Sequence, residues 1–352
     1  MDFILNGQAQ GGVASILMQN NFDVNGLRPF IGRDGRTYVT VNQSGVPVAV
    51  PLTNATATLR KDEWKLLDEA VVAAAKPRLK AVADLRSRGL QYSIPNGMAK
   101  TVLETEKQSD ISAATISMDG LRESQADRPV YELTNLPLPI IHKDFFFSAR
   151  QVAASRNGGS PLDTTTAELA ARRVAEQAEQ LTLGKLATYT YGGGTIYGLT
   201  NFPGSLLKTI TSPTASGWMP STTVREVLEM RQQSQNAFHY GPWMLYCGPA
   251  WDVYLDEDYS SEKGDNTLRE RLEKIQDIQG VQTLDYLTGY EMVLLQLTND
   301  VARMVVGMDV TTVQWETQGG MQLNFKVMAI IVPQIRSDFN GNTGIVHASV
   351  AA

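Results

Sequence analysis

The sequence predicts an α+β fold that carries long extended segments, and three observations support this prediction. The span 164–184 shows the 3–4 spacing of apolar residues that is typical of an amphipathic helix. The run from 323 to 335 becomes nearly continuous in apolar residues, as expected of a central, buried strand. The stretches 1–58 and 98–137 are polar and extended, and they contain too few apolar residues to form cores of their own.

Composition and charge narrow the class of protein. The 352 residues are 43% hydrophobic, which is enough for a packed core, and their formal charge of -6 argues against tight, charge-driven binding of nucleic acid. The single cysteine, Cys247, excludes a disulfide framework, and its apolar neighbours predict a buried thiol. We find no signal peptide and no apolar run of membrane-spanning length. The expectation is a soluble protein made in the cytoplasm.

The N-terminal part divides into an arm and a helical region. Residues 1–58 are expected to form an extended arm with one small hairpin, because the turn Arg33–Arg36 contains Asp-Gly. Within 59–97, the apolar spacing from Trp64 to Ala75 predicts a helix that Pro77 splits. Between Arg60 and Arg88 the chain carries eight basic and five acidic residues. Two interpretations stay open for this excess: a solvated helix face, or a surface near nucleic acid.

The middle of the chain predicts a hairpin, a long helix and a loop. Residues 98–137 are expected to form a long two-stranded hairpin that needs a neighbour to lie on. In 138–219, the helix 164–184 is expected to begin with a capping box of Thr165 and Glu168 and to end at Gly184. The Gly-rich stretch 189–203 lacks the Lys-Ser/Thr ending of a phosphate loop, so it is interpreted as a flexible surface loop.

The C-terminal part is a mixture of helices and strands. Residues 220–320 predict helices and strands in alternation, and residues 321–352 predict one last long strand followed by a tail that starts at Ser337. The expected helices are 222–237, 250–259 and 267–275, and the expected strands are 243–247, 281–284, 290–297, 302–307 and 323–335.

The sequence shows no motif for catalysis or for binding a cofactor or metal, and we expect no catalytic residue, no cofactor and no metal. His142, His239 and His347 lie about a hundred residues apart, which argues against a His-rich motif. The acidic run 256–258, with Asp252 one turn earlier, lacks the ligand spacing of a calcium loop, so we interpret it as a solvated helix end. No nucleophile motif lies near a histidine. The protein is therefore not expected to be an enzyme.

Several ordered motifs resemble encapsulin shell proteins over roughly residues 60–335. The segments that carry the resemblance are Leu136–Ile141, Gly159–Asp163, Ala171–Glu176, Ile196–Asn201, Gly241–Tyr246, Ala250–Leu255, Met304–Val310 and Phe325–Val332. Encapsulins share the Hong Kong 97-type fold of tailed-bacteriophage major capsid proteins. The resemblance implies an extended loop (E-loop) at 98–137, a peripheral domain at 138–219 with a spine helix at 164–184, an axial domain at 220–320, and a strand in 321–352 that returns to the peripheral domain.

The chain departs from encapsulins by about 58 additional N-terminal residues and by its continuation past the last strand. An N-terminal arm is typical of phage capsid subunits, so the expected function is a phage major capsid protein that forms pentamers and hexamers of an icosahedral shell. The alternatives are an encapsulin that encloses a protein cargo, and a tail-tube or decoration protein.

The resemblance also implies partners and a modification. Expected partners are further copies of the chain and scaffold, portal and decoration proteins, and the shell would enclose DNA without sequence-specific binding, in the virion and earlier in the host cytoplasm. Some proteins of this fold cross-link an E-loop lysine to an asparagine of a neighbour. The candidates here are Lys100, Lys107, Asn340 and Asn342, with ordinary solvated lysines as the alternative.

Overall fold

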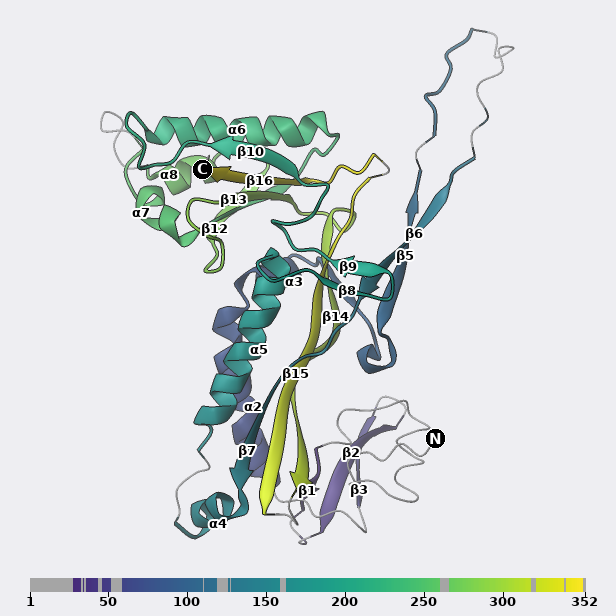
Figure 1. Ribbon diagram of the computed structural model, residues 1–352, viewed down its shortest axis with the longest axis vertical. Coiled ribbons are helices and arrows are strands. Elements are labelled where there is room, and N and C mark those ends of the chain that lie inside the picture. Colours follow the sequence, from purple (N-terminus) through teal and green to yellow (C-terminus); the bar gives the residue numbers. More distant parts are fainter. Residues whose placement is uncertain are drawn as a thin grey trace.

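The computed structural model is elongated, and two sheets with their helices occupy its two ends (Figure 1). The structure describes residues 28–32, 34, 36–43, 46–51, 59–109, 111–118, 126, 128–158, 163–259, 266–317, 321–338 and 340–350. Most of the arm 1–58, including Arg33 and Gly35 of the predicted turn, and most of the predicted hairpin tip therefore lie outside the described residues. Among the described helices, none is long and apolar enough to cross a membrane.

A four-stranded sheet forms the long axis of the molecule. Its order is β4 (Gln91–Ser93), β14 (Ala302–Thr317), β15 (Gln322–Ile335) and β7 (Ile141–Ser148). β14 and β15 are antiparallel over almost their whole length, and β7 pairs antiparallel with β15. The predicted buried strand at 323–335 is thus confirmed as β15, which is flanked by a strand on each side. This position explains why the apolar run of β15 is nearly continuous, because residues on both faces of the strand are buried.

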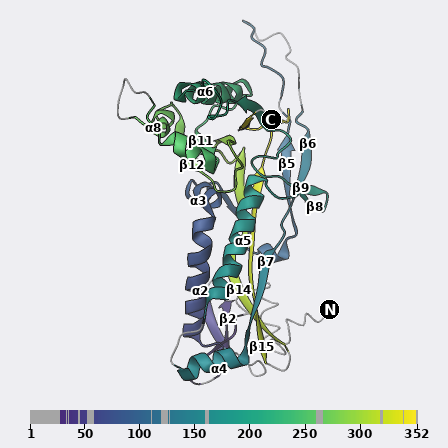
Figure 2. The ribbon, with the colours of Figure 1, turned by 60° about the vertical axis from the view of Figure 1, so that its left-hand side comes forward.

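Helices α2 (Lys61–Ala75) and α5 (Thr165–Leu183) lie side by side against one face of this sheet (Figures 1 and 2). Their apolar stripes pack on the aromatic side chains of the sheet, where Phe325 stacks on Phe145 at a centroid distance of 5.2 Å and meets Trp64 edge-on. The predicted helix 164–184 is confirmed, and Gly184 ends it at a φ of 77°.

The predicted capping box at the start of α5 is wrong. The backbone N–H of Thr165 donates to Asp163 Oδ1 at 3.0 Å, and Glu168 instead accepts from the hydroxyl of Thr164 at 2.8 Å. The sequence pattern located the first turn of the helix correctly but not the capping side chain. Asp163, two residues before Thr165, supplies a charged acceptor for the free N–H group of Thr165.

Pro77 splits the N-terminal helical region as predicted, into α2, a 3-10 turn η2 (Lys76–Arg78) and α3 (Lys80–Ser87). The N-terminus of α3 is held by Glu179 of α5, whose buried carboxylate accepts from the backbone N–H of Ala81 at 2.6 Å and of Val82 at 3.3 Å. Burial raises the pKa of Glu179 to about 7, against the opposing effect of these two hydrogen bonds.

Three basic residues of the split helix pair with carboxylates elsewhere in the chain. Lys80 pairs with Asp285 at 2.7 Å, and Arg86 pairs with Asp309 at 2.8 Å. Arg78 lies 4.0 Å from Glu176 of α5. Ion pairs therefore neutralise part of the local positive charge. Neither the solvated helix face nor the surface near nucleic acid includes such pairing.

A five-stranded sheet forms the other end of the molecule. Its order is β10 (Leu206–Ile210), β16 (Ile345–Val350), β13 (Met292–Gln296), β11 (Trp243–Cys247) and β12 (Ile278–Thr283), and α6 (Pro220–Asn236), α7 (Asp252–Leu255) and α8 (Leu268–Glu273) accompany it. β11 is buried throughout, so the prediction of a buried Cys247 is confirmed. The helix expected at 250–259 is shorter, a 3-10 turn η4 (Pro249–Trp251) followed by α7.

The segment after Ser337 is not a tail throughout. Residues 345–350 form β16, which lies between β10 and β13 and is parallel to β10. Its Ile345, Val346 and Ala348 are fully buried. The sequence pattern did not identify this strand, because six residues with one histidine and one serine give only a short apolar signal.

Two smaller pieces, a helix and a small sheet, contact α2. A helix that the sequence analysis missed, α4 (Ala149–Gly158), joins β7 to the segment before α5, and its Arg156 binds both carboxylate oxygens of Glu63 on α2. The N-terminal strands β1 (Phe30–Ile31), β2 (Thr37–Gln43) and β3 (Val46–Pro51) form a sheet, in which β1 and β2 pair antiparallel on either side of the predicted turn and β3 adds a third strand. This sheet is attached to α2, where the indole N–H of Trp64 donates to the carbonyl of Pro29 at 2.9 Å.

The raised pKa of Glu179 predicts a pH dependence of stability. The folded carboxyl holds its proton up to about pH 7, whereas the unfolded one titrates near 4.5. The contribution is therefore fully present below pH 4.5 and is lost as the pH rises to 7, by about 3 kcal/mol at most. Urea unfolding of unassembled subunits at pH 5 and pH 8 should show this loss, and Glu179→Gln should remove it. Glu132→Gln, at an exposed position on β6, is the control that should keep the wild-type difference. An unchanged pH dependence in Glu179→Gln would contradict the assignment.

Candidate assembly interface

A two-stranded hairpin projects from the body of the molecule between the two sheets (Figure 1). Its strands are β5 (Val102–Gln108) and β6 (Tyr131–Pro137), which pair antiparallel over seven residues. At its base Leu103 and Leu136 are buried in a small core with residues of β14 and β15. Further out, Tyr131 and Leu133 are more than half exposed. Among its described residues, the hairpin is therefore anchored at its base.

The segment beyond β5 exposes large apolar side chains. Residues 111–118 are all exposed, and Ile116 and Met118 are almost completely open to solvent at 97% and 106%. Burying one such side chain is worth about 2 kcal/mol. Apolar side chains gathered on a projecting segment indicate a surface that another molecule covers.

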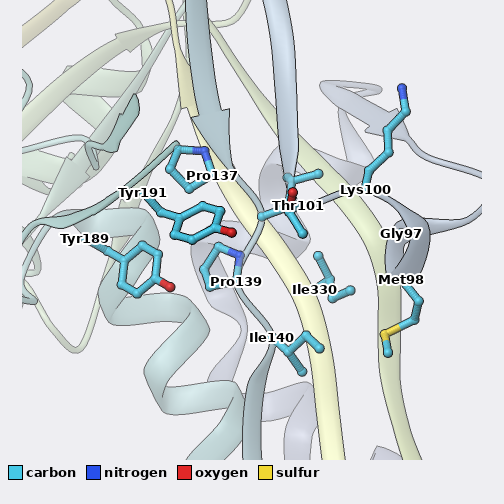
Figure 3. Close-up of a pocket in the computed structure, with 11 residues that line it drawn as sticks. Gly97, Met98, Lys100, Thr101, Pro137, Pro139, Ile140, Tyr189, Tyr191 and Ile330 are labelled. Carbon is cyan, nitrogen blue, oxygen red and sulfur yellow. The ribbon is translucent and has the colours of Figure 1, made fainter. Parts of the chain in front are cut away.

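A pocket of about 180 Å³ lies where the hairpin joins the four-stranded sheet (Figure 3). Pro137 and Pro139 stiffen the chain there, and the rings of Tyr189 and Tyr191 lie beside them. Lys100 is at the rim, with its side chain directed away from the tyrosines. The base of the hairpin is therefore a stiff, largely apolar joint.

The tyrosines belong to a second short hairpin, β8 (Tyr189–Tyr191) with β9 (Gly194–Ile196), where the sequence analysis expected a flexible loop. The glycines explain the difference. A Cβ atom on Gly194 would lie 2.0 Å from the carbonyl oxygen of Asn135 on β6, so only glycine permits this approach. The Asn135 side-chain amide also donates to the carbonyl of Gly192 at 2.9 Å. The two hairpins brace each other, and no local sequence pattern indicates this contact.

The four predicted cross-linking residues occupy different places. Lys107 is on β5, where its Nζ donates to Ser337 Oγ of the same chain at 3.1 Å. Asn340 and Asn342 lie in the tight turn that follows Ser337, and the backbone N–H of Asn342 donates to Asp338 Oδ1 at 2.8 Å. Lys100 is at the other end of β5, about 23 Å away along the strand. Within one subunit the structure thus brings Lys107, and not Lys100, beside the turn that carries the asparagines.

The acidic run and His347 lie beside charged residues of the same chain. Arg269 lies between Asp252 and Asp256, at 3.3 Å and 3.2 Å, so this run faces a cation that the chain itself provides. Burial lowers the pKa of His347, which lies 4.0 Å from Glu291. Within the described ranges, no three His, Cys, Asp or Glu residues gather as a metal site would require. Burial also raises the pKa of the Cys247 thiol to about 12.

Comparisons with known proteins agree with this arrangement. A family described as "Family of unknown function (DUF6260)" matches residues 54–348. The type 1 encapsulin shell protein EncA of Myxococcus xanthus (strain DK1622) is 24% identical over 292 residues, and the match covers 81% of this chain and 93% of that protein.

Among solved structures, the virus-like particle from Pyrococcus furiosus has a TM-score of 0.58 at 18% identity and covers 81% of this chain and 99% of its own. The capsid of Myoviridae phage XM1 has a TM-score of 0.57 at 10% identity, with 75% and 90% covered. The expected fold is therefore confirmed. The chain belongs to the family DUF6260, a family of unknown function, and it has the Hong Kong 97-type fold of phage capsids and encapsulin shells.

Proposed function

We propose that the protein is the major capsid protein of a tailed phage, which assembles as pentamers and hexamers into an icosahedral shell around double-stranded DNA. The observation that carries the proposal is the anchored hairpin, whose segment 111–118 is exposed in the single subunit and is available for another molecule to cover. A Hong Kong 97-type fold supports a shell as that assembly. The N-terminal sheet β1–β3 lies outside the region that the family matches, and it favours a phage subunit.

The mechanism of shell assembly depends on how the two parts of each subunit contact neighbouring subunits and on the large number of these contacts. The five-stranded part serves as the axial domain that meets its copies around each axis, and the E-loop hairpin of one subunit lies over the four-stranded part, the peripheral domain, of the next. Each contact can be modest, because closure of a symmetric shell joins many of them. The charge of -6 on each subunit lets the shell enclose DNA without holding it tightly. Scaffold, portal and decoration proteins are the further partners we expect.

An encapsulin shell that encloses a protein cargo is the second candidate. It is favoured by the likeness to EncA of Myxococcus xanthus, which extends over 93% of that protein. The two candidates share the fold and the shell, and they differ in what the shell contains.

Particles made by the full chain distinguish the two candidates. After overexpression, sedimented material is examined by electron microscopy, and its nucleic acid and protein content is measured. The phage proposal predicts large shells or open tubes without a second abundant protein, because such capsids depend on other phage proteins for size control. Small uniform shells with a co-purifying protein would favour the encapsulin. Subunits that never assemble under any condition would refute both.

The exposed segment of the hairpin predicts a variant that folds but does not assemble. Ile116→Asp should reduce the yield of shells at least tenfold, because the buried charge costs several kcal/mol in each contact. The unfolding midpoint of the unassembled subunit should stay unchanged, since Ile116 is exposed there. Thr115→Asp places the same charge one residue earlier, on the opposite side of an extended chain, and should assemble much better. Equal yields from the two variants would argue against a buried Ile116.

Covalent cross-linking between subunits stays a prediction for Lys100, Lys107, Asn340 and Asn342. Mature shells that form it should give ladders on denaturing gels, and Lys107→Arg should remove the ladder if Lys107 is the donor. Lys100→Arg tests the other lysine in the same way. A single band at the subunit mass from mature shells would exclude the modification.

A further inference from the structure

An open apolar groove lies between the C-terminal end of α2 and the first half of α5. It has a volume of about 480 Å³, within the range of pockets that bind ligands. Ala73, Ala74 and Pro77 form one wall, and Leu169 of α5, 51% exposed, forms the other. Among the charged residues at the rim are Arg78, Lys80, Arg172, Glu168 and Asp285, so basic residues are in slight excess.

The N-terminal segment, residues 1–27, is tethered close to this groove. The segment lies outside the described residues, and it joins the described chain at Arg28. The Arg28 guanidinium forms an ion pair with Asp68 and lies 4.7 Å from the ring centroid of Trp64, so α2 itself holds the attachment point. Asp68 and Pro77 are separated by about 14 Å along the helix axis. Nine residues separate Met18 from Arg28, and when extended they reach about 30 Å, enough to cross the helix.

The charge and the apolar residues of segment 1–27 are complementary to the groove. Residues 1–27 contain no lysine or arginine and carry only Asp2 and Asp23 as charged side chains. The segment contains two runs of three bulky apolar residues, Phe3–Leu5 and Ile16–Met18, and the second run lies nearer to the attachment point at Arg28. A short tether gives such a cluster an effective concentration in the millimolar range at the groove, so a weak apolar contact is enough to fill it.

We propose that Ile16–Met18 bind in the groove between α2 and α5 of their own subunit. The chain thereby covers Leu169 and the alanine wall with its own N-terminal segment. The proposal concerns a single subunit and holds whether or not the shell proposed above contains DNA.

Cross-linking of the full chain tests the contact. Cys247 is fully buried, so the variant Leu17→Cys with Leu169→Cys offers a short bismaleimide two reactive thiols. Trypsin leaves residues 1–33 as one peptide, because Arg28 precedes Pro29, and mass spectrometry detects its link to the peptide 157–172. The yield should exceed at least tenfold that of the control pair Leu17→Cys with Val253→Cys, whose second position is an exposed apolar residue on α7. In the first pair, Ile16→Asp should lower the yield about tenfold, and Asn20→Asp should not.

Isotope labelling decides which subunit provides the groove. Subunits labelled with ¹⁵N and unlabelled subunits are mixed before assembly, and the proposal predicts links within one isotope only. Equal yields from the two cysteine pairs, or links between labelled and unlabelled peptides, would overturn it, and so would a link from Leu169→Cys to a co-purifying protein. Electron microscopy of the same samples reports shell formation separately, so a failed contact and a failed shell proposal are distinguishable.

Discussion

The antiparallel pairing of β14 with β15 is the constraint on which the rest of the structure depends. These two strands of sixteen and fourteen residues span the length of the four-stranded sheet. One face of the sheet receives the aromatic core beneath α2 and α5, and the end near Val305 and Ile330 receives the base of the β5–β6 hairpin. The ladder therefore fixes where the helices lie and the site from which the hairpin projects.

The parts that project differ from the parts that pack in how they use apolar residues. Phe147 is buried among rings, whereas its neighbour Phe146 is 60% exposed, as expected on a strand with one covered face. On the hairpin, by contrast, Ile116 and Met118 have no such alternation to explain their exposure. That exposure acquires a physical reason only in an assembly, where a second molecule removes the apolar area from water.

Helix α3 connects the two ends of the molecule through polar contacts. Its N-terminus is bound by Glu179 of α5, and its Asp84 accepts a hydrogen bond from the hydroxyl of Tyr246 on β11 at 2.7 Å. Arg88 at its C-terminal end donates to Asp84 and to Gln279 on β12. A helix of eight residues thus connects the four-stranded and five-stranded parts, since charge-assisted hydrogen bonds are directional and stronger than neutral ones.

The sequence by itself determined the elements with strong periodicity: the helix ended by Gly184, the helix split at Pro77 and the buried strands β11 and β15. These signals are local, because the period of the apolar residues and the dihedral limits of glycine and proline act within a few residues. The order of the sequence motifs also identified the Hong Kong 97-type fold, and the paired strands β5 and β6 lie inside the predicted hairpin.

Only the tertiary structure decided the features that depend on distant partners. β16 became a strand because β10 and β13 provide its hydrogen bonds, and the glycines before Ile196 formed a hairpin because β6 approaches them. The position of Glu179 under α3 and the pairing of Arg156 with Glu63 join residues 98 and 93 positions apart. No spacing rule connects such residues, since their contact exists only after the chain has folded and excluded water from between them.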